Sequence, residues 1–136
     1  MVDKYIALAG YISKHASAKH DWVEHSCASF VGGWIGIISG INPFDPYRGK
    51  ITSALSWLRL MKSLGYYSME DALKGTPEVA EKLGRGMRGD IALVSHPKGP
   101  RWDFIGILDS DGVACLAPHG LIKVSRKQVK NYWSII

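Results

Sequence analysis

The chain has 136 residues, 46% of them hydrophobic and 21% charged, and a formal net charge of +5, a composition that excludes a disordered or fibrous chain. Its size is that of one globular domain, which we expect to span residues 1–136. The longest apolar run, residues 30–41, is shorter than the roughly 20 residues of a membrane span, and the first residues do not resemble a secretory signal, so we expect neither a span nor export.

The first part of the chain predicts helices. Apolar residues recur at three- and four-residue spacing between residues 2 and 18, which is typical of one apolar stripe on a helix. The predicted stripe consists of Tyr5, Ile6, Ala9 and Ile12. Ser26 is the expected N-cap of a second, strongly apolar helix that contains Trp34. Glycines in this helix, such as Gly33, weaken helix propensity, and we expect them to let a neighbouring element approach closely.

The next segment predicts a loop and three further helices. Two prolines and two glycines within residues 40–49 predict a loop. A helix is predicted over residues 51–64, ending before a glycine. It is expected to bury Leu55, Leu58 and Met61. The Ser-x-x-Asp pattern at residues 68–71 predicts a capped short helix, and the Thr76-Pro77 pair predicts another one after it.

After Gly89 the pattern changes to strands. Short runs rich in Ile and Val are separated by turn sequences, which predicts antiparallel strands joined as a meander. The predicted strands cover residues 90–95, 102–108, 113–116 and 121–124, followed by an extended piece through Trp133. Helices first and strands second predict an α+β fold, with N-terminal helices of about residues 1–84 packed on a C-terminal antiparallel β-sheet of about residues 88–136.

Cys27 is the residue at which the sequence points to chemistry. It stands at the start of the second predicted helix, where unpaired backbone N–H groups and the helix dipole favour the nucleophilic thiolate. A cysteine beside an apolar run is also a common small core residue, so the position alone leaves both interpretations open. We expect Cys27 and Cys115 to be reduced thiols, because a lone cysteine pair without an export signal is more often unpaired.

Three segments carry a resemblance to a known family. They are His-Ser-Cys-Ala-Ser-Phe-Val at residues 25–31, Gly-Asp-Ile-Ala-Leu-Val at residues 89–94 and Phe-Ile-Gly-Ile-Leu-Asp at residues 104–109. In this order they resemble the NlpC-type cell-wall cysteine peptidases, most of all an uncharacterised phage and prophage branch often found among tail-assembly proteins. The resemblance implies a permuted papain-like (NlpC-like) domain over nearly the whole chain, with Cys27 at the catalytic cysteine position.

Three positions depart from the pattern of this family. Phe104 stands where the active peptidases have their catalytic histidine, Ser26 stands where they usually have aspartate, and their third polar residue falls near Leu116. A phenyl ring cannot accept a thiol proton. The resemblance therefore implies a structural or binding component of a phage-type virion tail. Its partners would be other tail or virion proteins, and it would occur in the tail or, during assembly, in the host cytoplasm.

The alternative is an active cysteine peptidase or amidase that cleaves cell-wall peptides of peptidoglycan. Cys27 would be its nucleophile, and its base would have to replace the missing histidine. His119, in the loop after the third predicted strand, is the best substitute, although an exposed turn histidine is the simpler interpretation of that residue. The sequence leaves open whether the chain is an enzyme.

No cofactor and no metal site is predicted. The histidines and cysteines lack the spacing of a zinc site, and residues 109–112 predict a hairpin turn more readily than a calcium loop. The densest basic cluster consists of Lys123, Arg126, Lys127 and Lys130. We interpret it as a solvated face, and nucleic acid is an unlikely partner because neither an aromatic platform nor a DNA-reading helix accompanies these residues.

Overall fold

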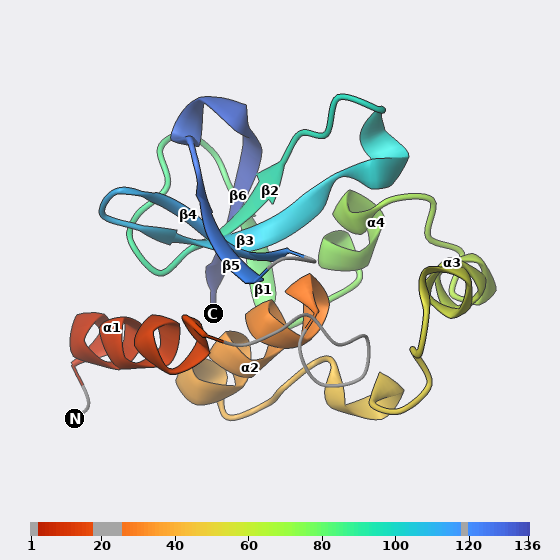
Figure 1. The fold of residues 1–136 in the computed structure, drawn as a ribbon, viewed down its shortest axis with the longest axis horizontal. Coiled ribbons are helices and arrows are strands. Elements are labelled where there is room, and N and C mark those ends of the chain that lie inside the picture. Colours follow the sequence, from red (N-terminus) through yellow and green to blue (C-terminus); the bar gives the residue numbers. More distant parts are fainter. Residues whose placement is uncertain (1–2, 18–25, 118–119) are drawn as a thin grey trace.

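Helices and strands occupy separate parts of the chain in the structure, a computed structural model that describes residues 3–17, 26–117 and 120–136 (Figure 1). The helices are α1 (Lys4–His15), α2 (Cys27–Ser39), α3 (Ala54–Ser63) and α4 (Met69–Lys74), and short 3-10 turns are η1 (Asp45–Tyr47), η2 (Pro100–Trp102) and η3 (Arg126–Gln128). The strands are β1 (Val79–Lys82), β2 (Ile91–Val94), β3 (Phe104–Asp109), β4 (Gly112–Ala117), β5 (Gly120–Val124) and β6 (Val129–Ile135). The predicted α+β class, with N-terminal helices packed on a C-terminal antiparallel sheet, is confirmed.

The sheet is antiparallel and has the strand order β1-β6-β2-β3-β4-β5. Strands β2 to β5 form the predicted meander. Strand β6 then returns to pair with both β1 and β2, so that Trp133 lies opposite Glu81 on one side and Ile91 on the other. This last strand joins the segment that follows the helices to the meander.

The prediction of a short helix after Thr76-Pro77 is wrong, because residues 79–82 form strand β1. Val79 is buried in the core, and the strand pairs with residues 132–135 of β6. A segment of four residues gains few helical hydrogen bonds, whereas β6 offers it a continuous ladder. Pairing with a distant strand therefore overrides the local proline signal.

Helix α2 lies under the sheet and contacts β3, β4 and β6 (Figure 1). Its residues Phe30, Trp34 and Ile35 are almost fully buried. The predicted cap is confirmed, since the Ser26 hydroxyl accepts a hydrogen bond from the Ser29 N–H. These contacts hold the first turn of α2, which carries Cys27, against the sheet.

Close approach at the glycines of α2 is also confirmed. A Cβ atom at Gly33 would overlap the hydroxyl of Tyr11, which donates a 2.6 Å hydrogen bond to the Phe30 carbonyl. A Cβ atom at Gly32 would lie 2.7 Å from Oδ1 of Asn42, closer than such contacts allow. Because these glycines have no side chain, α1 and the loop after α2 can lie close to the helix backbone.

The apolar stripe predicted on α1 meets the core only in part. Ile12 packs against the main core, but the buried residues of this helix are Leu8 and Tyr11, while Tyr5 is exposed and Ile6 is 72% exposed. The reason is the docking of Tyr11 on α2, which turns the Leu8 face inward. None of the helices in residues 3–17, 26–117 and 120–136 is long and apolar enough to span a membrane.

Helix α3 is only partly as predicted. Met61 is buried, but Leu55 is exposed. The helix lies at the edge of the molecule, beyond α4 as seen from the sheet (Figure 1), so that only part of its surface meets other elements.

The second face of the sheet forms a small core of its own. Its buried residues are Ala92, Val94, Leu108, Val113 and Cys115. Val124 of β5, the neighbour of β4, and Val129 of β6, the neighbour of β2, pack against this cluster. Helices α1, α2 and α4 contribute to the core on the other face.

Candidate functional site

Cys27 is the first residue of α2, as the sequence predicts. The preceding Ser26 is buried and forms a capping box with Ser29, in which the Ser26 N–H donates to Ser29 Oγ at 2.7 Å. Ser26, at the position where the resembled family usually has aspartate, thus works as a helix cap. The capping box pairs the backbone N–H groups of Ser26 and Ser29 within the chain.

The thiol of Cys27 lies in an apolar environment against the main core. Burial raises its pKa, because a thiolate loses its hydration there, while the backbone N–H groups of Ile105, Ala28 and Cys27 itself act in the opposite direction. Burial dominates. The thiol is therefore held in its protonated, weakly nucleophilic form near neutral pH.

Strand β3 passes next to this sulfur. The Ile105 N–H group interacts with the thiol, and Ile105 follows Phe104 directly. The ring of Phe104 instead packs against the second core, with its centroid 6.3 Å from that of the His96 ring. The structure thus brings Cys27 to the strand that sequence reasoning named, but the side chain of Phe104 packs on the opposite face of the sheet from Cys27.

None of the other positions considered from the sequence supplies a general base for Cys27 within the described residues. Leu116 is buried in the main core. His119 lies outside the described residues, so the structure does not bear on its assignment as a substitute base. His25 and His20 lie outside them as well.

His15 is the last residue of α1. Its ring packs on the rings of Tyr11 and Phe30, with centroids 4.4 and 5.3 Å away, and its Nδ1 atom lies 2.9 Å from the Tyr11 carbonyl oxygen. Phe30 is one turn along α2 from Cys27. The spacing of four residues between Tyr11 and His15 was the available signal that they share a helix face.

Cys115 is a core residue. It is buried in the second core, and burial together with the charge of a Cys27 thiolate raises its pKa to about 12. Both cysteines are free thiols, as the sequence analysis expects.

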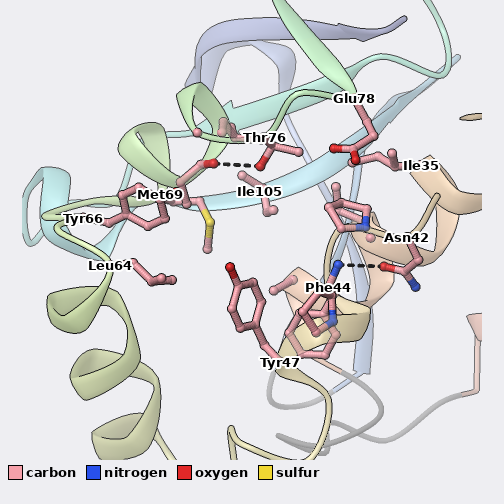
Figure 2. A pocket seen from close by; sticks show the side chains of 18 of the residues that line it. Ile35, Asn42, Phe44, Tyr47, Leu64, Tyr66, Met69, Thr76, Glu78 and Ile105 are labelled. Atoms are coloured by element: carbon pink, nitrogen blue, oxygen red, sulfur yellow. Dashed lines mark hydrogen bonds between the residues drawn. The ribbon is translucent and has the colours of Figure 1, made fainter.

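A cavity of about 260 Å³ lies between α2, α3 and α4, on the helical side of the molecule (Figure 2). Ala28, which follows Cys27, and Ile105 line one part of it. Apolar walls include Ile35, Phe44, Trp57, Leu64 and Met69. The sequence analysis does not predict this cavity, because its walls come from α2, the loop after it, α3, the segment around α4, and β3.

Three of the four residues of the basic cluster have intramolecular partners. Lys123 contacts Asp109 and Asp111 at 2.8 and 2.6 Å, and Lys130 Nζ lies 2.8 Å from Asp103 Oδ2. Arg126 donates to the Gly86 carbonyl. These cations have intramolecular partners, which weakens the case for phosphate binding.

Residues 109–112 form the turn between β3 and β4, as predicted. Asp109 accepts hydrogen bonds from Arg88 Nε and Lys123 Nζ, each at 2.8 Å, so the carboxylate is committed to cations of the protein. No group of His, Cys, Asp and Glu in the described ranges is arranged to hold a metal ion.

The Asp109 cluster predicts a loss of stability in acid. Burial disfavours the charged form of Asp109, but hydrogen bonds from Lys123, the Ser110 N–H and Arg88 outweigh this and lower its pKa from 3.8 to about 2. Because the folded state holds the lower pKa, the contribution is present above about pH 4 and is lost as the pH falls to about 2. We expect a loss of about 1–2 kcal/mol, discounted because both cations are about one-third exposed.

Urea unfolding at pH 5 and pH 2 measures this loss. Asp109→Asn should be less stable than the parent chain at pH 5 and should show a smaller difference between the two pH values. An unchanged difference in Asp109→Asn would assign the acid sensitivity to other carboxylates.

A family model described as "Domain of unknown function (DUF6950)" matches residues 3–135, which is nearly the whole chain. No curated protein and no solved structure matches the chain. An activity, a ligand or a partner must therefore be inferred from the residues themselves.

Proposed function

The chain belongs to this family of unknown function, and we propose that it is a binding or structural component of a phage-type virion tail, built on an NlpC-like fold that has lost its catalytic histidine. The observation that carries the non-catalytic part is the Cys27 thiol, which lies half-buried against the apolar core, where burial raises its pKa, beside a strand that begins with Phe104. The tail context comes from the resemblance of the sequence segments.

The arrangement of the elements is compatible with the proposed NlpC-like core. A helix that begins with the cysteine packs on an antiparallel sheet, and the Gly-Asp and Phe-Ile-Gly-Ile segments lead into or form the neighbouring strands β2 and β3. Fold likeness does not establish activity, so the chemistry of the site decides between the two functions.

The chemistry favours a non-catalytic role. A cysteine hydrolase needs a thiolate and a group that accepts the thiol proton. Burial of Cys27 opposes the thiolate, and Phe104 and Leu116 cannot accept a proton. On this proposal Cys27 is retained for packing, and partners such as other tail or virion proteins bind elsewhere on the surface.

The alternative, a working peptidase or amidase on peptidoglycan peptides, has one favourable observation. Three backbone N–H groups, those of Ile105, Ala28 and Cys27, act to stabilise a thiolate at this sulfur. In that case Cys27 would attack an amide carbonyl to form a thioester. His119 would take the thiol proton and pass it to the leaving amine, and water would then release the acid.

Alkylation of Cys27 separates the two functions. In Cys115→Ala, which leaves Cys27 as the single thiol, we expect iodoacetamide to react at pH 6–8 about tenfold more slowly in the folded protein than in urea, because burial holds the sulfur protonated. Mass spectrometry over time gives both rates. Folded protein that reacts faster than unfolded protein at pH 6 would contradict the proposal.

Direct assays complete the test. Purified chain incubated with peptidoglycan fragments should release no new amino groups. Release that disappears in both Cys27→Ala and His119→Ala would establish the alternative. The tail role is tested separately, by mass spectrometry of purified virions from the host strain, in which the chain should be found with the tail proteins.

A further inference from the structure

We propose that the cavity between α2, α3 and α4 binds a small amphipathic ammonium ligand, one with an aromatic or branched apolar body and an amine that reaches Glu78. This inference goes beyond the proposed function, because it depends neither on the tail context nor on the state of Cys27. It starts from a polar atom that the protein leaves unsatisfied.

Glu78 supplies that atom. Its Oε2 is buried without a hydrogen-bond partner, the one side-chain atom of this kind in the described part of the chain. Glu78 precedes strand β1 and lines the cavity, and Figure 2 shows its carboxyl group near Thr76 and Ile35. Buried polar atoms are nearly always paired, so an orphan acceptor at a cavity wall is a place where a donor group of a ligand can bind.

The neighbouring polar groups do not donate to this oxygen. The Thr76 hydroxyl donates to the Ala72 carbonyl at 2.7 Å, and Asn42 Oδ1 accepts from the Phe44 N–H at 2.9 Å (Figure 2). The Tyr47 hydroxyl points into the cavity, and none of the hydrogen bonds drawn in Figure 2 reaches it. A ligand would thus meet an acceptor at Glu78 and a second, adaptable polar group at Tyr47.

The walls define the body of the ligand. They are largely apolar and aromatic, from Ile35, Phe44, Trp57, Met61 and Met69. A dry cavity of about 150 Å³ already binds benzene. The 260 Å³ present here therefore accommodates an aromatic ring with a short side chain.

Charge decides the head group. A carboxyl group at the wall favours a cationic donor over a neutral one and repels a carboxylate. The aromatic walls also tolerate an ammonium group, since ring faces attract cations. The expected ligand class is therefore an aryl- or alkyl-ammonium compound, as opposed to a neutral alcohol or a carboxylic acid of the same shape.

Three probes of similar shape test the inference on the full chain: 2-phenylethylamine, 2-phenylethanol and 3-phenylpropionate. Titration followed by tryptophan fluorescence, with calorimetry as a second readout, gives their affinities. The amine should bind about tenfold more tightly than the alcohol, and the propionate should bind most weakly. Equal binding of amine and alcohol, or tightest binding of the propionate, would overturn the proposal.

Substitutions test whether the preference for the amine over the alcohol depends on Glu78. Glu78→Gln should bind amine and alcohol equally, while Glu70→Gln should keep the preference, because Glu70 pairs with Lys74 and does not line the cavity. Ala72→Leu, which fills part of the cavity, should weaken both probes. An undiminished preference in Glu78→Gln would also overturn the proposal, and circular dichroism checks that each variant is folded. If Glu78→Gln does not fold, the order of the three probes on the parent chain still decides.

Discussion

Trp34→Ala should lower the free energy of unfolding by about 3–5 kcal/mol, which is a large part of the stability of a domain of this size. Trp34 is 0% exposed and lies in the main core, with its ring 5.8 Å from that of Tyr11. Its Nε1 donates to the Gly89 carbonyl at 2.9 Å and so ties α2 to the turn before β2. Alanine would leave a cavity and a buried carbonyl without a donor.

Urea unfolding of Trp34→Ala measures the loss, and Trp102→Ala is the matched control. Trp102 is 50% exposed, and its ring lies near Lys98, so its removal should cost less than about 1 kcal/mol. If the two variants lost similar amounts of unfolding free energy, the prediction that Trp34 contributes far more to stability than Trp102 would be contradicted.

Asp90→Ala is expected to cost about 2–4 kcal/mol. Asp90 is 3% exposed and accepts hydrogen bonds from Lys82 Nζ and the Met87 N–H, each at 2.8 Å, and from Ser134 Oγ at 3.3 Å. One carboxylate therefore joins β1, the turn before β2, and β6. The upper end of the range is discounted because the side chain of Lys82 is 27% exposed.

Thermal and urea unfolding of Asp90→Ala test this value. Asp45→Ala is the control, because the ion pair of Asp45 with Arg48 is solvent-exposed and should contribute less than about 0.5 kcal/mol. Asp90→Asn, which keeps an acceptor, should lie between the two. A loss in Asp90→Ala no greater than in Asp45→Ala would show that the Gly-Asp segment does not hold the strands together.

The parts of the fold that local chemistry determines were predictable. Serines 26 and 68 cap helices where their hydroxyls meet free N–H groups, and both caps are as expected. The strands rich in Ile and Val and the Asp-Ser-Asp-Gly turn needed no information from elsewhere in the chain. These features depend on neighbours within four residues.

The errors come from contacts between distant segments. The apolar spacing of α1 allowed a stripe through Ile6, but the docking of Tyr11 on Phe30 selected another face. Residues 79–82 became a strand because β6 pairs with them from fifty residues away. The local sequence pattern predicts neither the buried face of α1 nor strand β1, because each depends on the distant segment that packs against it.

The candidate site divides in the same way. The meeting of Cys27 with the strand of Phe104 was inferred from a resemblance over three short segments, and the structure places the Ile105 N–H at the thiol. The burial that raises the pKa of Cys27 could not be read from a helix start, which by itself favours the thiolate. The sequence could not predict the unpaired Glu78 oxygen, because the residues around it come from other elements of the fold.

Strand β6 connects β1 to the rest of the sheet. Since β6 is the single strand that pairs with β1 in the described sheet, β1 can detach while the meander β2 to β5 stays intact, whereas loss of β6 would remove the strand pairing of β1. Glu78 sits directly before β1, and its backbone carbonyl accepts from the N–H of Ile136, directly after β6. The shape of the ligand cavity is thus coupled to whether the final strand is seated, although no residue of that strand lines it.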